Sequence, residues 1–366
     1  MKFIQVAGTN AKGSVCTYAA EILTRAGYRC GLFTSPHLIR REERIRIDGE
    51  EIPTRELDRL MRENPGKTLF HTYLNACMKW FAENGVQVAV METGLGGRID
   101  PVSELPVDVV VLTPIGIDHA EVLGDTVEKI ALEKCRTVRQ NGYVVCAPQQ
   151  EAVRKIIETT CDLARARLVA LAWEDIGREA DGKFSFRQHG GLCVRGIGPS
   201  QPMDAALAIA AVRGLSHVGI YVDERSVREG IARANIPGRM QYLPRLDMLI
   251  DGGHNEGAFC ELERTLDQRF PKREKVLLCA AMKEKDISYL ADMAQRQNIR
   301  VFATQLNMER ARSADELGTL FKSCEAIKNT KEALLRAQKT AQKNNALLIV
   351  AGSFYLAGEV LALIGE

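Results

Sequence analysis

The sequence lacks the cysteine spacing that would indicate a disulfide framework or a zinc site. None of its ten cysteines forms a C-x-x-C pair, and most lie in apolar stretches typical of strands or helices. Disulfides persist in oxidising compartments, whereas isolated thiols in apolar surroundings are typical of reducing ones. The cysteines are therefore predicted to be buried and reduced, and the protein to be cytoplasmic.

The sequence also lacks long apolar runs and a large excess of charge of one sign. No apolar run reaches the length of a membrane span, and MKFIQVAGTN meets a glycine turn after seven residues, too early for a signal peptide. The formal net charge is +2 at pH 7, and no basic stripe is interleaved with aromatic residues. We therefore expect no membrane and no nucleic acid as partner, and favour small-molecule chemistry.

What the sequence has is enough apolar material for two cores. Its 366 residues exceed the size that one hydrophobic core usually supports, and 46% of them are hydrophobic. Pro237-Gly238 interrupts a helical pattern and is the best candidate for a linker. We predict two domains, residues 1–238 and 239–366.

Both halves alternate short apolar strands with amphipathic helices, which predicts an α/β fold with mostly parallel sheets. Residues 168–200 differ, because short alternating segments and Gly-Gly turns predict a small antiparallel insertion there. The second half is expected to form a smaller parallel α/β domain. The expected strands cover residues 3–7, 30–34, 86–92, 109–113, 143–147, 248–251, 275–281, 301–305 and 346–351.

A phosphate-binding loop is predicted between the first strand and the helix after it, with the sequence Gly8-Thr9-Asn10-Ala11-Lys12-Gly13-Ser14. Backbone N–H groups and the helix dipole attract phosphate oxygens there, and Lys12 can reach the terminal phosphates. The strict Walker pattern is not met, because Gly13 separates Lys12 from Ser14. The alternative is a plain glycine-containing turn, which needs neither the lysine nor the flanking hydroxyl residues.

Two further strands end in residues suited to divalent cations. Glu92 closes VAVME before the glycine-rich TGLGGR, and open α/β sheets bind ligands at this edge. Asp118 and His119 follow the next strand in TPIGIDH and suit a second ion, while Lys134 on the helix after it is expected to point inward. Taken singly, each has a plain alternative: a strand-end acid, a structural histidine, a solvated lysine.

Taken together, the ordered motifs resemble the folylpolyglutamate synthase and dihydrofolate synthase family, within the Mur ligase superfamily. The resemblance runs over nearly the whole chain. The motifs that carry it are GTNAKGS, FTSPHLIRREERIRIDGEEI, METGLGGRID, TPIGIDHAEVLGDTVEKIALEK, PGRMQ, DGGHNEGAF and AGSFYL.

The resemblance implies an N-terminal P-loop ATPase domain and a C-terminal, Rossmann-like glutamate-ligase domain, with ATP as the nucleotide. The phosphate loop would then bind ATP, and Lys12 would act in catalysis. Ser35 of the TSP motif and Glu92 match residues that hold Mg²⁺, and His119 matches a residue that serves a second Mg²⁺. Lys134 matches a lysine that is typically carbamylated, which gives an inward lysine a reason.

On the C-terminal side, the resemblance implies that Arg239 and Asp251 act on the nucleotide. His254 lies in the same loop as Asp251 and is a further catalytic candidate. Gln201 matches a position beside the nucleotide base. The plain alternatives are a solvated arginine for Arg239 and a turn-stabilising side chain for His254.

The implied reaction joins L-glutamate to a folate-type acid. The substrate's γ-carboxylate attacks the γ-phosphate of ATP, and the amine of glutamate then attacks the resulting acyl phosphate. Closure of the two domains about a hinge near Pro237 would keep water from the acyl phosphate. The resemblance also implies a monomer.

The departures from the family pattern fall mainly on the acceptor side. The DATN motif appears as Asp100-Pro101-Val102-Ser103, His71 replaces a common acidic residue, and Ala11 replaces a glycine. HQ-x-x-N appears as Ser200-Gln201-Pro-Met-Asp204. The chain also begins directly at its first strand, so the family's preceding segment, part of the pterin-binding region in dihydrofolate synthases, is expected to be missing.

The missing segment is expected to weaken recognition of dihydropteroate, which favours folylpolyglutamate synthesis and leaves several alternatives. The first is dihydrofolate synthase activity, alone or combined. The second is a ligase of the same fold that acts on a non-folate carboxylate. The third is a nucleotide-binding regulatory protein without turnover, against which Lys12, Glu92, His119 and Lys134 argue. A P-loop kinase or GTPase fits poorly, because neither explains a second α/β domain carrying DGGHN.

Overall fold

The computed structural model describes residues 1–365, which fall into two compact units. The first comprises Met1–Arg195 and Gln201–Asn235, and the second comprises Gly196–Ser200 and the chain from Ile236 onward. The sequence pattern did not indicate that residues 196–200 belong to the second unit. A functional boundary at residues 238 and 239 stays a prediction. Over the described residues, no helix is both long and apolar enough to cross a membrane.

The first unit is built on an eight-stranded sheet in the order β4-β3-β2-β5-β1-β6-β7-β8. The strands from β2 to β8 in this order are parallel, and β3 and β4 form an antiparallel edge. Their bounds are β1 Lys2–Ala7, β2 Cys30–Phe33, β3 Ile45–Ile47, β4 Glu50–Glu51, β5 Val88–Glu92, β6 Val109–Leu112, β7 Tyr143–Cys146 and β8 Arg167–Ala170. The expected α/β class with a mostly parallel sheet is confirmed.

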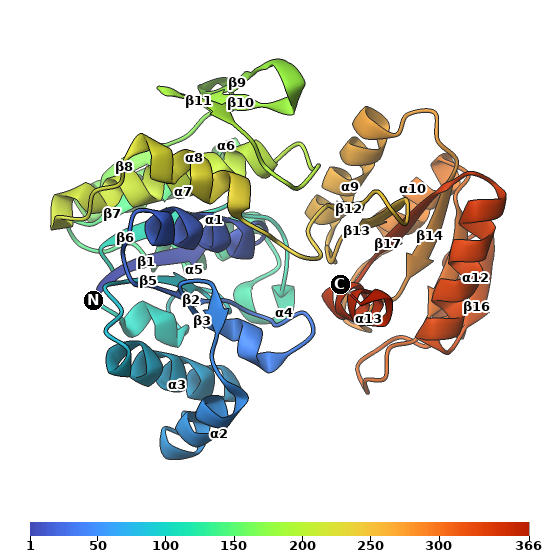
Figure 1. Cartoon of the computed structure of the whole chain (residues 1–366), viewed down its shortest axis with the longest axis horizontal. Helices are drawn as coiled ribbons and strands as arrows, with labels where there is room; N and C mark the ends of the chain where they lie inside the picture. Colours follow the sequence, from blue (N-terminus) through green and yellow to red (C-terminus); the bar gives the residue numbers. More distant parts are fainter. Residues whose placement is uncertain (366) are drawn as a thin grey trace. The chain divides into compact units, whose positions relative to one another are not determined.

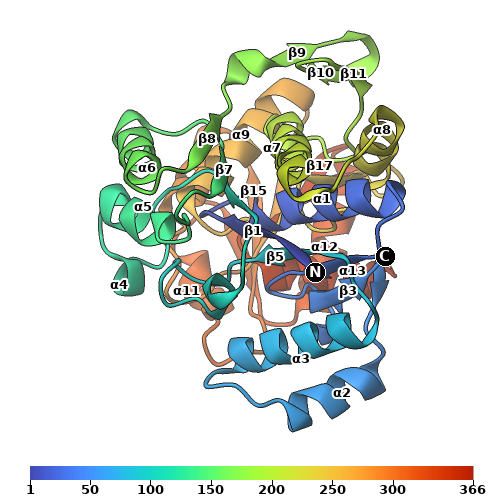
Figure 2. The ribbon, with the colours of Figure 1, turned by 90° about the vertical axis from the view of Figure 1, so that its left-hand side faces the viewer.

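Helices cover both faces of this sheet, as the apolar strands require (Figures 1 and 2). One face carries α1 (Lys12–Arg25), α7 (Gln201–Gly214) and α8 (Glu224–Arg233). The other packs against α2, α3, α5 and α6 through two apolar clusters, so that Phe3 and Ala7 of β1 point to this side. The bounds are α2 Thr54–Glu63, α3 Leu69–Glu83, α4 Ala120–Leu123, α5 Val127–Cys135 and α6 Glu151–Leu163.

The predicted antiparallel insertion is confirmed in part. Strands β9 (Ile176–Arg178), β10 (Phe184–Phe186) and β11 (His189–Leu192) form a three-stranded antiparallel sheet. The start of the expected segment was assigned wrongly, because β8 pairs parallel with β7 in the main sheet. β8 lies at the edge of that sheet, and none of its four residues is fully buried.

The second unit contains a six-stranded sheet in the order β12-β13-β17-β14-β15-β16, parallel except for the edge strand β12. Edge strands β12 and β16 were not predicted, because neither is a continuous apolar run. The strands are β12 Gln241–Leu243, β13 Met248–Ile250, β14 Lys275–Cys279, β15 Arg300–Thr304, β16 Cys324–Ile327 and β17 Leu347–Ala351. The helices are α9 Glu256–Arg269, α10 Ser288–Arg296, α11 Ala314–Gly318, α12 Thr330–Lys343 and α13 Phe354–Ile364.

The helix carrying the phosphate loop depends on a glycine in its neighbour. A Cβ added at Gly230 of α8 would lie 2.6 Å from the Ile22 Cα and 2.7 Å from the Ile22 N of α1. Backbone atoms cannot move aside as the end of a side chain can, so any residue larger than glycine pushes the two helices apart.

We expect Gly230→Ala to lower the free energy of unfolding by about 1–3 kcal/mol, the usual cost of overpacking a close contact. Urea unfolding followed by circular dichroism measures the change. Gly116→Ala is the control, because a Cβ there meets no atom within 4 Å. Equal stability of the two variants would contradict a close helix crossing at Gly230.

Candidate active site

The phosphate loop leaves β1 through a turn that only glycine can form. Gly8 has a φ of 153°, and a Cβ on it would lie 1.8 Å from the Thr113 Oγ1 at the end of β6. Ala11 caps α1 with a φ of 67°, a left-handed conformation that favours the glycine found at this position in the family pattern. The loop is therefore held tightly between β1 and β6, with Lys12 and Ser14 in the first turn of the helix.

Glu92 and Ser35 lie together at the carboxyl edge of the sheet, beside that first turn. Glu92 ends β5, is 4% exposed, and accepts a 3.0 Å hydrogen bond from the Ser35 N–H through its Oε2. A Cβ on Gly13 would lie 3.5 Å from the same Oε2, so the carboxylate faces the start of α1. Because β5 and β2 are neighbours in the sheet, their ends bring the two predicted metal residues together.

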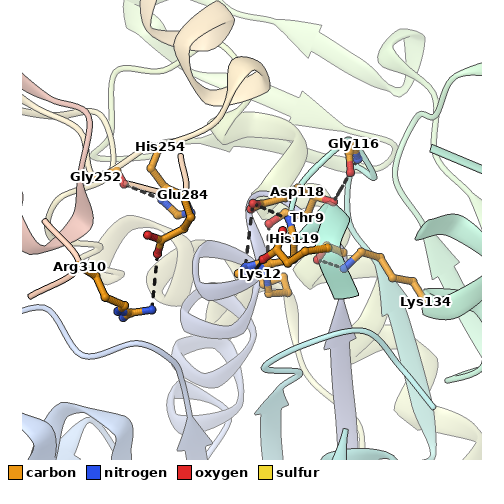
Figure 3. Close-up of polar contacts among 12 residues, drawn as sticks. Thr9, Lys12, Gly116, Asp118, His119, Lys134, Gly252, His254, Glu284 and Arg310 are labelled. Carbon is orange, nitrogen blue, oxygen red and sulfur yellow. Dashed lines mark hydrogen bonds and ion pairs between the residues drawn. The ribbon is translucent and has the colours of Figure 1, made fainter. Parts of the chain in front are cut away.

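Lys134 is buried, as its inward orientation in the predicted helix required. It is 5% exposed, and its Nζ donates a 2.7 Å hydrogen bond to the carbonyl oxygen of Gly8. Burial and the nearby Lys12 charge lower the pKa of Lys134 to about 7, although Asp118 acts in the opposite direction. The ammonium form is therefore destabilised beside the phosphate loop (Figure 3).

His119 follows β6 on a loop that leads into α4. It caps α4 with a left-handed φ of 52°, and its N–H donates a 3.0 Å hydrogen bond to the Asp118 Oδ1. Its side chain is 44% exposed, and its ring nitrogens lie 4.0 Å from carboxylates of Asp118 and Glu121. His119 thus has carboxylate neighbours and is accessible to solvent. A divalent ion that keeps some of its bound water requires both.

The donor set fits magnesium better than a metal held by protein alone. Over residues 1–365, no three histidine, cysteine or acidic side chains gather into a metal-binding cluster. Magnesium usually keeps several waters and binds one or two carboxylates together with substrate phosphates. Glu92 beside Ser35 and the phosphate loop is such an arrangement.

Asp100 is a buried acid in this region to which the sequence assigned no role. Its carboxylate accepts hydrogen bonds from the N–H groups of Leu95 (2.8 Å) and Val102 (2.9 Å), which braces the glycine-rich turn after Glu92. Burial raises the pKa of Asp100, and these backbone hydrogen bonds oppose that effect. An aspartate directly before Pro101 is a typical helix cap, which was the signal available in the sequence.

In the second unit, Asp251 organises the loop that follows β13. It is 4% exposed and accepts hydrogen bonds from the N–H groups of Met240 (3.2 Å) and Gly253 (3.0 Å). Burial raises the pKa of Asp251, while the Arg239 charge lowers it. The Arg239 guanidinium lies 4.8 Å from the ring centre of Phe354, and the His254 Nδ1 lies 3.3 Å from the Gly252 oxygen. Arg239, Asp251 and His254 therefore belong to one polar region.

Two charged residues of the second unit were not singled out from the sequence. Arg310 and Glu284 form an ion pair at 3.5 Å, which links the loops after β15 and β14 (Figure 3). The sequence did contain a sign of these charged loops, because the apolar strands are followed directly by the charged segments MKEKD and NMERAR.

Gln201 begins α7 in the first unit, where its orientation is fixed by a neighbour. The Tyr18 hydroxyl donates a 2.7 Å hydrogen bond to the Gln201 Oε1. Burial, which disfavours the phenolate, raises the pKa of Tyr18. Because Tyr18 lies one helical turn beyond Ser14, this contact ties the start of α7 to the helix that carries the phosphate loop.

Comparison with known proteins agrees with this arrangement. Residues 6–174 match the Mur ligase middle domain, and residues 238–354 match the Mur ligase glutamate ligase domain. The dihydrofolate synthase/folylpolyglutamate synthase of Escherichia coli K12 is 30% identical over 374 residues, which cover 98% of this chain and 86% of that protein. The chain belongs to the dihydrofolate synthase/folylpolyglutamate synthase family.

Solved structures of this family share the fold and hold nucleotides. The Mycobacterium tuberculosis folylpolyglutamate synthase complexed with ADP and AMPPCP superposes with a TM-score of 0.91 at 26% identity, covering 100% of this chain and 91% of that one. The bifunctional folylpolyglutamate synthase/dihydrofolate synthase of Yersinia pestis, complexed with AMPPNP and Mn ion, has a TM-score of 0.88 at 26% identity, with 100% and 89% coverage.

In this member of the folylpolyglutamate synthase/dihydrofolate synthase family, the segment from Asp100 to Ser103, which replaces the DATN motif, is hydrogen-bonded to other parts of the same chain. The Gln5 Nε2 of β1 donates hydrogen bonds to the hydroxyls of Ser103 (2.8 Å) and Thr93 (3.1 Å). Arg139 also donates to the Ser103 carbonyl oxygen. The side chains of Gln5 and Arg139 therefore hold this segment in place, although its sequence departs from the family pattern.

Burial of Lys134 gives the folding equilibrium a pH dependence of known sign. Its pKa is about 7 when folded and about 10.4 when unfolded, so between these values the unfolded chain binds the additional proton. The stability of the wild type relative to Lys134→Met should therefore rise from about pH 7 to about pH 10, by at most about 1.4 kcal/mol per pH unit.

Urea unfolding in bicarbonate-free buffer at several pH values measures this difference. Lys155→Met is the matched control, because the Lys155 side chain is 65% exposed and should show no such trend. A wild type and a Lys134→Met variant whose stabilities run parallel from pH 7 to 10 would contradict a lowered pKa.

Proposed function

We propose that this chain is a folylpolyglutamate synthase, an ATP-dependent ligase that adds L-glutamate to the γ-carboxylate of tetrahydrofolate and releases ADP and phosphate. The observation that carries the proposal is the joint position of the phosphate loop, Glu92, Ser35 and buried Lys134 at one sheet edge. A protein that only bound nucleotide would not need a buried lysine with a lowered pKa there.

In this proposal, residues Gly8 to Ser14 bind the phosphates of ATP. Backbone N–H groups at the start of α1 donate to the phosphate oxygens, and Lys12 neutralises charge on the terminal phosphate. Ser35 and Glu92 would hold one Mg²⁺ and His119 a second. The ions would neutralise the charge that develops as the phosphoryl group is transferred.

The reaction then proceeds in two steps. The γ-carboxylate of the folate attacks the γ-phosphorus of ATP, the bond to the bridging oxygen breaks, and ADP leaves an acyl phosphate. The neutral amine of L-glutamate attacks the acyl carbon and expels phosphate, and loss of one proton from nitrogen leaves the amide. Lys12 and the phosphate loop hold the transferred group in line through the first step.

We propose that Lys134 is carbamylated in the active enzyme. With a pKa of about 7, a substantial fraction of its side chain is a free amine near neutral pH, and only the amine attacks carbon dioxide. The amine nitrogen forms a bond to the carbon of carbon dioxide and loses one proton, which leaves a carbamate anion. Counted from the ammonium form, two protons are released and a cation is replaced by an anion. Such an anion would suit a position close to both Lys12 and divalent metal.

The remaining assignments concern the nucleotide. Arg239 and Asp251 would contact it from the C-terminal domain, His254 would act from the same loop, and Gln201 would lie beside the base. The buried hydrogen bonds of Asp251 and the Tyr18–Gln201 contact support rigid placement of two of these side chains. We further propose a cytoplasmic monomer with no nucleic-acid or membrane partner.

Dihydrofolate synthase activity is the second candidate, because the Escherichia coli relative that is 30% identical is named dihydrofolate synthase/folylpolyglutamate synthase. The altered segment from Asp100 to Ser103 departs from the family pattern on the acceptor side. The same departure keeps a non-folate carboxylate as a third possibility for the test.

Glutamate-dependent phosphate release from ATP tests the proposal, with tetrahydrofolate, with dihydropteroate and with neither. We expect turnover with tetrahydrofolate, and a loss of at least about 100-fold in kcat for Lys12→Ala and Glu92→Gln, which remove transition-state charge stabilisation. Lys155→Ala, an exposed lysine on α6, controls for loss of positive charge in general. Its kcat should match the wild type.

The other outcomes are equally specific. Turnover with dihydropteroate alone would replace the proposal by the second candidate. ATP binding without turnover on either acid would point to a different carboxylate or to a regulatory protein.

A further inference from the structure

The side chain of Thr9 joins the phosphate loop to the loop that carries His119. Its Oγ1 donates a 3.0 Å hydrogen bond to the Gly116 carbonyl oxygen and accepts a 3.1 Å hydrogen bond from the Gly116 N–H (Figure 3). One hydroxyl thus satisfies both backbone groups of a single residue. Gly116 lies three positions before His119.

Backbone contacts extend this junction along both loops. The N–H groups of Thr9 and Asn10 both point to the Pro114 carbonyl oxygen, at 2.9 and 3.4 Å. The Thr113 Oγ1 donates a 2.7 Å hydrogen bond to the Asn10 carbonyl oxygen. The first half of the phosphate loop is therefore paired with residues 113–116, and movement of one segment displaces the other.

The far side of the His119 loop is fixed by Gln149. Its Oε1 accepts a 3.0 Å hydrogen bond from the Ile115 N–H, and its Nε2 donates one of 3.0 Å to the Thr113 carbonyl oxygen. With Gln149 on one side and Thr9 on the other, the loop has little freedom before Gly116. Beyond it, His119 holds a left-handed φ of 52°, which persists only where neighbouring structure imposes it.

We propose that Thr9 is a positioning residue that couples nucleotide binding at the phosphate loop to divalent-cation binding at His119. The Thr9 hydroxyl sets the position of Gly116 and, through the short segment after it, of the His119 ring. The inference rests on the proposed function, because it requires that the loop bind nucleotide and that His119 serve a metal ion.

The same contacts could serve folding alone, and the two roles differ in a measurable way. If the contacts serve folding alone, their removal lowers the stability of the protein. If they only hold the phosphate loop in shape, their removal lowers nucleotide affinity in the absence of metal. A positioning role for His119 changes metal affinity in the nucleotide complex. Outer residues that orient metal ligands typically change metal affinity by about 10–100-fold when replaced.

The experiment titrates Mn²⁺ into the protein–AMPPNP complex and follows free Mn²⁺ by electron paramagnetic resonance. Calorimetry measures ADP affinity separately in the absence of metal. Thr9→Val removes the hydroxyl at nearly constant volume and should weaken Mn²⁺ binding to the AMPPNP complex about tenfold, a clearly larger loss than that of metal-free ADP affinity. Thr9→Ser restores the hydroxyl and should restore Mn²⁺ binding.

Thr17→Val is the matched control. Thr17 is also partly buried, and its hydroxyl donates a 2.8 Å hydrogen bond to the Gly13 carbonyl oxygen within α1, so it joins no second loop. It should bind Mn²⁺ as the wild type does. If Thr9→Val does not fold, Thr9→Ala removes the same hydroxyl without placing a methyl group against Gly116.

A double-variant cycle with His119→Ala decides the route of the coupling. In the His119→Ala background, Thr9→Val should have little further effect on Mn²⁺ binding, because the residue it positions is already gone. Unchanged Mn²⁺ affinity in Thr9→Val, or an equal loss of metal-free ADP affinity, would overturn the inference. A wild type that binds neither AMPPNP nor Mn²⁺ would instead refute the proposed function.

Discussion

The close approach of Gly8 to Thr113 determines where the phosphate loop leaves the sheet. No side chain fits between them, since a Cβ on Gly8 would lie 1.8 Å from the Thr113 Oγ1. β1 lies between β5 and β6, so the segments that follow all three strands meet at one edge. Glu92 arrives from β5 and His119 from the loop after β6, on either side of the phosphate loop.

Burial of charge is the second constraint, and it sets the chemistry available at this edge. Lys134 and Lys12 lie near the same loop, and burial together with the Lys12 charge lowers the pKa of Lys134 to about 7. The hydrogen bond from Lys134 to the Gly8 carbonyl oxygen fixes the amine in place. A lysine whose side chain is partly unprotonated near neutral pH can react as a nucleophile, whereas a solvated lysine remains protonated.

Buried aspartates hold the loops of both units in shape. Asp100 accepts N–H groups of the turn after Glu92, and Asp251 accepts those of Met240 and Gly253. In each case backbone hydrogen bonds offset the cost of burying a carboxylate. Loops fixed in this way present their ligand-facing atoms with little reorganisation, which favours phosphoryl transfer by positioning.

The sequence by itself determined the α/β class, the parallel strands and the phosphate loop, because apolar runs and glycine positions are local signals. It also predicted that Lys134 points inward. The edge strands β12 and β16 were missed because neither is a continuous apolar run, and β8 was assigned to the antiparallel insertion although it pairs parallel with β7. Only the tertiary structure decided that Thr9 bonds to Gly116, more than one hundred residues away, and that residues 196–200 pack with the second unit. Contacts between distant segments depend on how the strands are ordered in the sheet, and no local pattern encodes that order.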